Sequence, residues 1–245
     1  MKVSLITPTY NSSKTLLKTL ESVARQTYKD IEHIIIDGKS SDTTIDIIKS
    51  FPHIHKYISE PDNGMYDAMN KGIKLSSGEI IGILNSDDYY TNDKVIENIV
   101  KQFEQRNMDA LYADINYIDE KGKIIRKWRS GDYAKIKFLD GWMPPHPTFF
   151  IKKVFYEKYG LYQTSFGISA DYELMLRMLF KYDLEAFYFN EVIIHMLTGG
   201  QSNSSLKKRI QANVEDRRAW EINNLNPHWY TLLKKPFKKV IQYVQ

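Results

Sequence analysis

The chain has 245 residues, with 34 Lys and Arg against 30 Asp and Glu, so its formal net charge is +4. Hydrophobic residues make up 42% and aromatic residues 13%, which is typical of a globular protein and excludes a disordered one. The absence of cysteine excludes a disulfide scaffold, a thiolate zinc site and a cysteine nucleophile. No apolar run approaches the roughly 18 residues of a spanning helix, and the N-terminus meets Pro8 too early for a signal peptide. We expect a cytoplasmic protein, peripheral to a membrane at most.

The positive charge is concentrated at the C-terminal end. Residues 205–245 contain nine Lys or Arg and three acidic residues, a net charge of +6, which leaves −2 for residues 1–204. Proteins that bind nucleic acid more often carry basic residues on the folded face. The distribution therefore argues against a nucleic-acid partner and predicts a basic extension on a slightly acidic body.

The first hundred residues alternate between strand and helix patterns. The expected strands cover 3–7, 31–36, 54–59 and 80–84. The expected helices cover 16–24, 42–51, 65–75 and 95–103. This alternation is typical of βαβ units, so we predict an α/β fold with a mostly parallel sheet flanked by helices.

The second half has a different pattern. Segments 110–118 and 123–127 flank a polar turn and predict a β-hairpin. A proline-rich loop follows, and the remaining segments predict, in order, a strand at 148–151, a helix at 171–182, a strand at 187–196, a polar helix at 205–223 and a shorter amphipathic helix at 229–244. No repeat or linker divides the chain into independent domains.

Polar segments follow the four expected strands of the first half, at 7–11, 37–38, 60–64 and 85–88. The carboxyl ends of parallel strands meet at one edge of a sheet, and ligands of such sheets bind at that edge. The shared position of these four segments is the first indication of a functional site.

The segment Asn85-Ser86-Asp87-Asp88 follows an apolar strand directly. Its oxygen ligands suit Mg²⁺ or Mn²⁺, which bind phosphate oxygens and retain waters. When the segment is taken alone, a helix N-cap is the better explanation. With three other polar strand ends beside it, we favour the metal site.

Two further acids follow strands, and each has two interpretations. The carboxylates of Asp37 and Asp62 can accept the imide N–H of a pyrimidine base, or they can form the turns that their Gly and Pro neighbours favour. From the residues alone, the turn interpretation is the stronger one for Asp37.

The second half offers further candidate site residues, which could contact a second substrate that accepts a transferred group. Asp171 begins a helix, whose dipole keeps it ionised, so it can deprotonate a hydroxyl or simply cap the helix. His146 lies between prolines and is either an acceptor contact or a structural histidine. Gly199 and Gly200 indicate a mobile loop near phosphates.

Taken in order, these segments resemble the inverting nucleotide-sugar glycosyltransferases of family 2, which have the GT-A fold. The matching motifs are ITPTYN at 6–11, IDGKSSD at 36–42, EPDNGMYDAMNKG at 60–72, GEI at 78–80, LNSDD at 84–88 and ADYE at 170–173. The resemblance covers roughly residues 1–200, and the ordered set is far more specific than any one motif. The run at 60–72 further resembles transferases of bacterial capsule, exopolysaccharide and O-antigen synthesis.

The resemblance implies an organisation. Residues 1–204 would form the GT-A domain, with a nucleotide-sugar-binding half at 1–100 and an acceptor-binding half at 101–204. Residues 205–245 would form a basic helical extension.

The resemblance also implies roles for individual residues. Thr7, Pro8 and Tyr10 would line the nucleotide pocket, Asp37 would contact the base, and Asp62 would contact the base or ribose. Asp87 and Asp88 would form the metal site, with Asp88 favoured as the direct ligand and Asn85 beside them. Asp171 would be the general base, and His146, Glu173, Gly199 and Gly200 would contact the acceptor or shape its loop. Two positions depart from the family pattern, because Asn85 and Ala170 stand where many relatives have acids.

The implied chemistry is a single displacement with inversion. The leaving nucleoside diphosphate needs a divalent cation, Mn²⁺ or Mg²⁺, and the acceptor hydroxyl needs one carboxylate base. We expect a UDP-sugar donor, because Asp37 and Asp62 suit uracil, and transfer of a hexose or N-acetylhexosamine. The expected acceptor is a glycan or a polyprenyl-diphosphate-linked sugar.

Aromatic residues alternate with lysines in the tail at 229–244, which is typical of contact with an anionic membrane surface. Such contact at the inner membrane would serve a lipid-linked acceptor. The alternative is a packing helix at a homodimer interface, and Pro236 limits the length of either helix.

Three other classes of protein fit the sequence less well. A haloacid-dehalogenase-like phosphatase needs a second Asp two positions after its nucleophile, but Asp37 is followed by Gly38 and Lys39. A nucleotidylyltransferase begins with a Gly-rich phosphate loop, which the first strand end lacks. A non-catalytic sugar-nucleotide-binding scaffold is disfavoured, because the expected carboxylates are present except at position 85.

Overall fold

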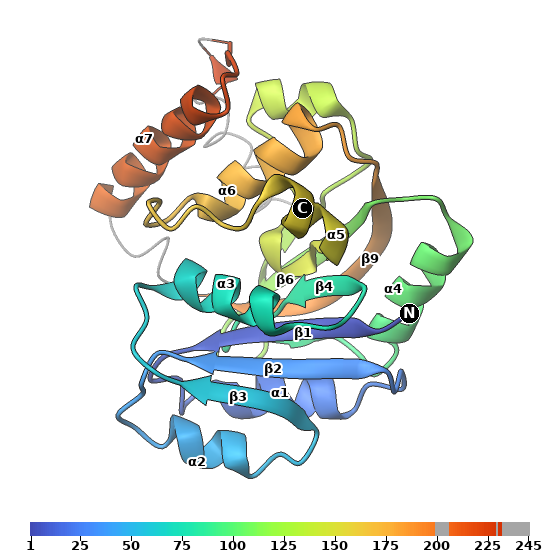
Figure 1. Cartoon of the computed structure of the whole chain (residues 1–245), viewed down its shortest axis with the longest axis vertical. Coiled ribbons are helices and arrows are strands. Elements are labelled where there is room, and N and C mark those ends of the chain that lie inside the picture. The colour runs from blue at the N-terminus through green and yellow to red at the C-terminus, as the bar shows by residue number, and fades with distance from the viewer. Residues whose placement is uncertain (199–205, 229, 232–245) are drawn as a thin grey trace.

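The computed structural model describes residues 1–198, 206–228 and 230–231. Its centre is a nine-stranded curled sheet with the order β3-β2-β1-β4-β8-β6-β9-β5, and β7 pairs with β6 outside this path (Figure 1). The strands are β1 (Val3–Thr9), β2 (Ile31–Asp37), β3 (Ile54–Ser59), β4 (Ile80–Ile83), β5 (Asp88–Tyr90), β6 (Ala110–Ile118), β7 (Ile124–Trp128), β8 (Phe150–Lys152) and β9 (Ala186–Leu197). The predicted α/β class is confirmed.

Helices cover both faces of this sheet. The α-helices are α1 (Leu16–Ala24), α2 (Thr44–Lys49), α3 (Met65–Leu75), α4 (Val95–Gln105), α5 (Lys153–Tyr159), α6 (Ala170–Met175) and α7 (Leu206–Ile222). Shorter helical turns are η1 (Lys135–Asp140), η2 (His146–Thr148) and η3 (Leu176–Lys181), the last of which is a π-helix that continues α6.

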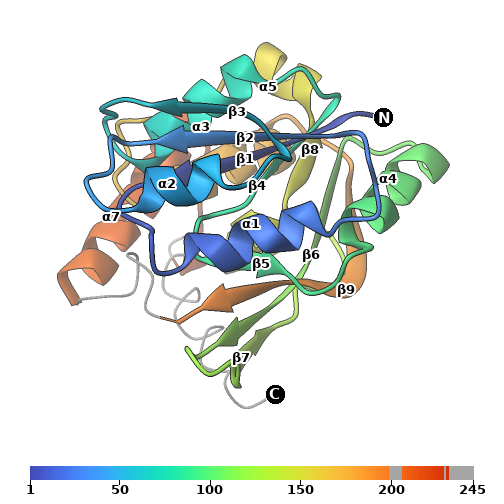
Figure 2. The ribbon, with the colours of Figure 1, turned by 90° about the horizontal axis from the view of Figure 1, so that it is seen from below.

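The first half of the sheet is parallel. Strands β3, β2, β1 and β4 run in the same direction, and Thr9 pairs with Asp37, which pairs with Ser59. Alternate residues of β2 face opposite helices: Ile35 packs with α1 and α2, whereas Ile34 and Ile36 pack with α3. Figure 2 shows α1 and α2 on one face of this half and α3 on the other. Burial on both faces explains why these strands are almost continuously apolar.

The second half of the sheet is mixed. Strand β8 is antiparallel to both β4 and β6, and β9 is parallel to β6. The hairpin predicted from the polar turn is confirmed as β6 and β7. Four elements were missed: η1, η2, α5 and the short strand β5, which begins at Asp88 and pairs with β9. The strand β5 has only three residues, which are too few to show the alternation by which a strand is predicted.

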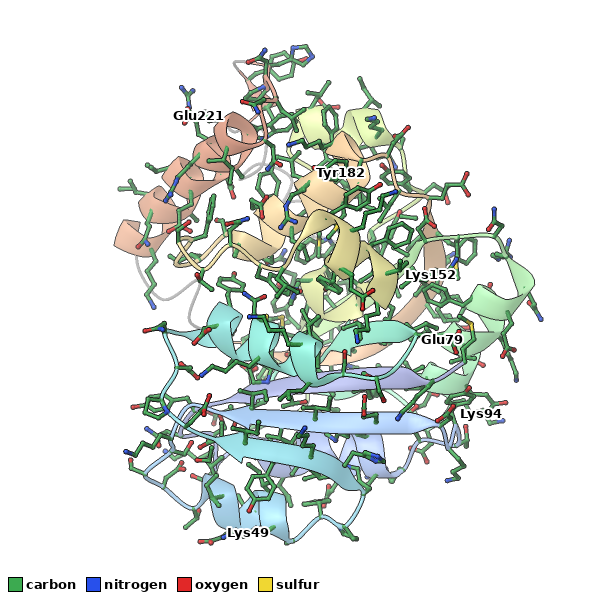
Figure 3. All side chains as sticks on the ribbon, viewed as in Figure 1. Lys49, Glu79, Lys94, Lys152, Tyr182 and Glu221 are labelled. Carbon is green, nitrogen blue, oxygen red and sulfur yellow. The ribbon has the colours of Figure 1, made fainter. Side chains whose placement is uncertain are left out.

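The largest hydrophobic cluster joins α3 to α6 and α7. Tyr66, Met69 and Ile73 of α3 belong to it, together with Ala219 and Trp220 of α7. Side chains fill the space between α3 and the helices above it, whereas Lys49, Lys94 and Glu221 lie on the outside (Figure 3). The helical part of the expected extension is therefore packed into the same core as the first 204 residues.

The expected amphipathic helix at 229–244 lies outside the described residues, apart from residues 230 and 231. Within the described part of the chain, no helix combines the length and apolarity needed to cross a bilayer.

Candidate active site

Asp37 organises the carboxyl ends of β1, β2 and β3. Its carboxylate is fully buried. Oδ1 accepts hydrogen bonds from the hydroxyls of Thr9 (3.1 Å) and Ser40, and Oδ2 accepts from Ser40 N (2.9 Å) and the Ser59 hydroxyl (2.7 Å). A carboxylate offers about four acceptor positions, so these donors occupy it. Asp37 ties three strand ends together, and the predicted contact with a base would require one of these bonds to break.

Thr7 and Pro8 do not reach an exposed surface. Both residues are buried, and the Thr7 hydroxyl lies 3.0 Å from Nε2 of His33. Burial, followed by the proximity of His53, lowers the pKa of His33 to about 3, so this contact involves a neutral imidazole. The side chains of Thr7 and Pro8 are therefore enclosed within the fold, and the place of these two residues in a nucleotide pocket stays a prediction.

Tyr10 and Asp62 do come together, and they meet above Gly38. Tyr10 is 64% exposed and Asp62 is partly exposed. A Cβ at position 38 would lie 2.6 Å from Asp62 Oδ2 and 3.3 Å from Tyr10 Cδ2. The other oxygen of Asp62 accepts a hydrogen bond from Gly64 N (2.9 Å). The missing side chain at Gly38 thus makes room for a carboxylate beside an exposed aromatic ring.

The acidic segment forms a tight turn between β4 and β5. Asp88 N donates to the Asn85 carbonyl (3.1 Å), and Asn85 Nδ2 donates to Asp88 Oδ2 (2.9 Å). Asp88 is fully buried, whereas Asp87 is partly exposed. Burial raises the pKa of Asp87, and burial together with the Asp87 carboxylate raises that of Asp88 well above its usual range.

This turn fits a divalent cation. Asn85 Oδ1 and Asp88 Oδ1 are buried oxygens without a hydrogen-bond partner. A cation there would offset the cost of burying two neighbouring carboxylates. The described residues contain no group of three or more His, Cys, Asp or Glu that could hold a metal by itself. The few oxygen ligands that Asn85, Asp87 and Asp88 offer suit Mg²⁺ or Mn²⁺, which complete their coordination with phosphate oxygens and water.

Residues 60–72 link this edge to the second half of the chain. Lys71 Nζ contacts the Pro61 carbonyl (3.1 Å) and the Glu60 carboxylate (2.9 Å), so α3 holds the loop that carries Asp62. A Cβ at Gly72 would lie 2.3 Å from a side-chain carbon of Ile6, which shows how closely α3 packs on β1.

Two residues of α3 contact the second half of the chain, and neither was given a role from the sequence. The Tyr66 hydroxyl lies 2.6 Å from the Ile168 carbonyl and 3.3 Å from Asp171 Oδ1. The Asn70 side chain exchanges two hydrogen bonds of 2.9 Å with the backbone of Tyr162. Their spacing of four residues, which places both on one helix face, was the available signal.

Asp171 lies in the first turn of α6 with one carboxylate oxygen open. Oδ1 accepts from Tyr172 N (2.8 Å) and faces Tyr66, whereas the described residues donate nothing to Oδ2. The side chain is partly exposed. An oriented carboxylate with one free oxygen is suited to removing a proton from a hydroxyl.

The turn before Asp171 is held by Glu215 of α7. This carboxylate accepts the backbone N–H groups of Gly167 (3.1 Å), Ile168 (2.8 Å) and Ser169 (2.9 Å). Burial works against the charge of Glu215, but these hydrogen bonds outweigh it and lower its pKa. No local sequence pattern marks this contact, because 46 residues separate Glu215 from Ser169.

Glu173, one of the predicted acceptor contacts, lies inside the fold. Its carboxylate is buried and accepts hydrogen bonds from Arg177 (2.8 and 3.0 Å) and Asn223 Nδ2 (3.0 Å). Two positions along a helix correspond to a rotation of about 200°, so Glu173 points away from the surface that Asp171 faces. It forms a structural ion pair.

His146 lies within a buried network that includes Tyr162. Its Nε2 is 2.7 Å from the Tyr162 hydroxyl, and the Tyr162 ring stacks on Tyr66 with centroids 5.7 Å apart. Burial lowers the pKa of His146, and Asp171 opposes this shift. The structural interpretation of His146 is the one that the geometry favours. Gly199 and Gly200 lie outside the described residues.

Comparisons with known proteins show the family of the chain. The model of Glycosyl transferase family 2 matches residues 4–181. An uncharacterised glycosyltransferase of Mycobacterium tuberculosis is 32% identical over 192 residues, which cover 71% of this chain and 68% of that protein. A PGL/p-HBAD biosynthesis glycosyltransferase of Mycobacterium bovis is 29% identical over 215 residues, which cover 84% and 80% of the two chains.

Two solved structures have a similar fold at low identity. Staphylococcus aureus TarS has a TM-score of 0.72 at 18% identity, and the match covers 96% of this chain but 41% of TarS. The mannosyltransferase PcManGT of Pyrobaculum calidifontis, solved with GDP-Man and Mn²⁺, has a TM-score of 0.68 at 17% identity, covering 96% and 69%. Since the family model matches most of the sequence, the chain belongs to glycosyl transferase family 2 and is a glycosyltransferase.

Proposed function

We propose that the protein transfers a sugar, with inversion, from a nucleotide-sugar donor to a hydroxyl of a glycan or polyprenyl-diphosphate-linked acceptor in bacterial surface-glycan synthesis. One observation carries this proposal. The loop that holds Asp62 continues into α3. Tyr66, four residues after Asp62, lies in the first turn of α3 and contacts Asp171. The N-terminal end of α3 thus connects Asp62, the acid proposed for the donor, to Asp171, the proposed base.

Tyr10 and Asp62 are the proposed contacts to the nucleoside. The exposed ring of Tyr10 offers a stacking surface, and Asp62 Oδ2 offers an acceptor for a base or ribose donor. TarS has been solved with UDP and with UDP-GlcNAc, and PcManGT with GDP-Man. We infer a UDP-sugar donor, because a carboxylate can accept the imide N–H of uracil, and a hexosyl or N-acetylhexosaminyl group.

Asn85, Asp87 and Asp88 are the residues that would hold Mn²⁺ or Mg²⁺. The burial of Asp88 and the partial exposure of Asp87 suit an ion that sits between the turn and the donor. A bound cation supplies positive charge to the leaving diphosphate.

Asp171 is the proposed base. Its Oδ2 takes the proton of the acceptor hydroxyl while that oxygen bonds to the anomeric carbon and the bond to the diphosphate oxygen breaks. One displacement inverts the anomeric configuration, and no covalent intermediate is formed. The segment 229–244, which we propose contacts the inner membrane or forms a homodimer interface, lies outside the described residues apart from residues 230 and 231.

The test is a nucleotide-release assay with UDP-, GDP- and TDP-sugars, with and without Mn²⁺ and with polyprenyl-linked or glycan acceptors. We expect metal-dependent release of UDP from one donor, and its loss in Asp171→Asn but not in Asp46→Asn, a change on the outer helix α2. Absence of release together with absence of nucleotide binding by calorimetry would overturn the proposal, whereas nucleotide binding without release from any donor and acceptor would favour the non-catalytic scaffold.

A further inference from the structure

Tyr66 connects the donor loop to the proposed base more directly than any other described residue. It is the second residue of α3, directly after the loop that carries Asp62, and it is 6% exposed. Its hydroxyl contacts the Ile168 carbonyl and Asp171 Oδ1, which lie 102 and 105 residues away in the chain. A residue that joins two such distant segments fixes the geometry between them.

The contacts of this hydroxyl limit what it can do. It has one proton, so the bond to Ile168 (2.6 Å) and the bond to Asp171 Oδ1 (3.3 Å) share a single donor. Burial, and then the charge of Asp171, raise the pKa of Tyr66 well above its usual range. The phenol therefore stays protonated and remains a hydrogen-bond donor at any working pH.

The Tyr66 ring is held as firmly as its hydroxyl. It stacks on Tyr162 with an interplanar angle of 23°, and the backbone of Tyr162 is bound by Asn70, one turn further along α3. The side chain cannot rotate without breaking this packing. This fixed donor lies beside Oδ1, whereas the described residues donate no hydrogen bond to Oδ2.

We propose that Tyr66 is a positioning residue for Asp171: its hydroxyl holds Oδ1 and the preceding loop, so that Oδ2 meets the acceptor hydroxyl beside the bound donor. This inference rests on the proposed role of Asp171 as base. The inference predicts that the Tyr66 hydroxyl contributes to turnover and not to nucleotide affinity. This hydroxyl is hydrogen-bonded to Asp171 and to the Ile168 carbonyl, and not to Asp62, Asp87 or Asp88.

The chain offers a matched control in Tyr156. Its hydroxyl is also buried and lies 3.4 Å from the Tyr162 hydroxyl in the same cluster, but it makes no contact with Asp171. Tyr66→Phe and Tyr156→Phe each remove one buried hydroxyl and keep the ring. Any general loss of packing or stability should affect the two variants alike.

The experiment measures kcat, KM for donor and acceptor, the Kd of UDP by calorimetry and the unfolding temperature of both variants. We expect Tyr66→Phe to lower kcat roughly 10- to 100-fold, the range of a hydrogen bond to a charged group, with the Kd of UDP within about twofold of wild type. Tyr156→Phe should keep a kcat within about twofold. A wild-type kcat in Tyr66→Phe, or equal losses in both variants, would overturn the inference.

A double-mutant cycle separates this inference from the proposed function. In an Asp171→Asn background, Tyr66→Phe should cause no further loss of residual activity, since the group that it positions is gone. Full activity of Asp171→Asn would refute the proposed base itself. If Asp171→Asn is inactive while Tyr66→Phe turns over normally, only the positioning role is refuted. Should Tyr66→Phe be unstable, the cycle is read below its unfolding temperature.

Discussion

Glu215 on α7 accepts a hydrogen bond of 2.9 Å from the backbone N–H of Ser169, the residue that caps the helix carrying Asp171. The same carboxylate also binds the two preceding N–H groups. A helix outside the family match at 4–181 therefore holds the turn beside the proposed base. The helix α7 therefore supports the turn that precedes the proposed base.

The first prediction concerns this clamp. Glu215→Ala leaves three backbone N–H groups without their acceptor, so we expect it to lower the free energy of unfolding by about 1–3 kcal/mol and to reduce kcat. Glu221→Ala, at an exposed position of the same helix, is the control and should change neither. Thermal unfolding and the release assay measure both. Equal behaviour of the two variants would contradict the clamp.

The second prediction concerns the base. Asp171→Asn keeps the shape of the side chain but removes its ability to take a proton, so kcat should fall by about 10² to 10⁴. The Kd of UDP should stay unchanged, because the residue lies on the acceptor side of Tyr66. A parallel loss of nucleotide binding would instead indicate a structural role.

The third prediction concerns Gly38. A Cβ there would approach Asp62 Oδ2 to 2.6 Å, so Gly38→Ala must displace that carboxylate, and the Kd of UDP should rise on the order of tenfold. In an Asp62→Ala background the same substitution should have little further effect, because the displaced group is absent. Additive effects in calorimetry would show that Gly38 acts on something other than Asp62.

The fourth prediction concerns the metal. Chelation of divalent cations should abolish release of UDP, and Mn²⁺ should tighten UDP binding in the wild type. Asp88→Asn keeps an oxygen near Asn85 but removes a buried charge, so the Mn²⁺-dependent part of the affinity should disappear. Calorimetry with and without Mn²⁺ gives both values. If Asp87→Asn loses this effect and Asp88→Asn does not, Asp87 is the direct ligand.

The fifth prediction concerns acid stability, through Glu32 on β2. Its carboxylate accepts hydrogen bonds from Ser4 Oγ (2.5 Å) and from Ser77 N (2.7 Å) and Oγ (2.9 Å). Burial opposes its charge, but these bonds and the Lys2 ammonium lower its pKa to about 2.

Because the folded-state pKa of Glu32 is depressed, its stabilisation is present above its ordinary pKa of about 4.5 and is lost as the pH falls towards about 2. Wild type should therefore exceed Glu32→Gln in unfolding free energy at pH 7, with a difference that shrinks below pH 4.5. Denaturant titrations at several pH values test this. A difference independent of pH would show that charge is not involved.

The sequence by itself determined the α/β class, the elements of the first hundred residues apart from β5, and the edge at which the proposed site lies. Apolar runs such as 31–36 and helical periodicity such as that of 65–75 are local, and α3 has the predicted bounds. The ordered motifs identified the family, because their residue types and order can be recognised without knowing any contact.

Only the tertiary structure decided which side chains within those motifs are available. Asp37 and Thr7 look like ligand contacts in the sequence, yet their hydrogen bonds to Ser59 and His33 turn them inward. Glu173 differs from Asp171 because two steps along a helix reverse its direction. Tyr66 and Glu215 reach Asp171 or the turn before it from more than 40 residues away, and contacts between such distant residues leave no local pattern in the sequence.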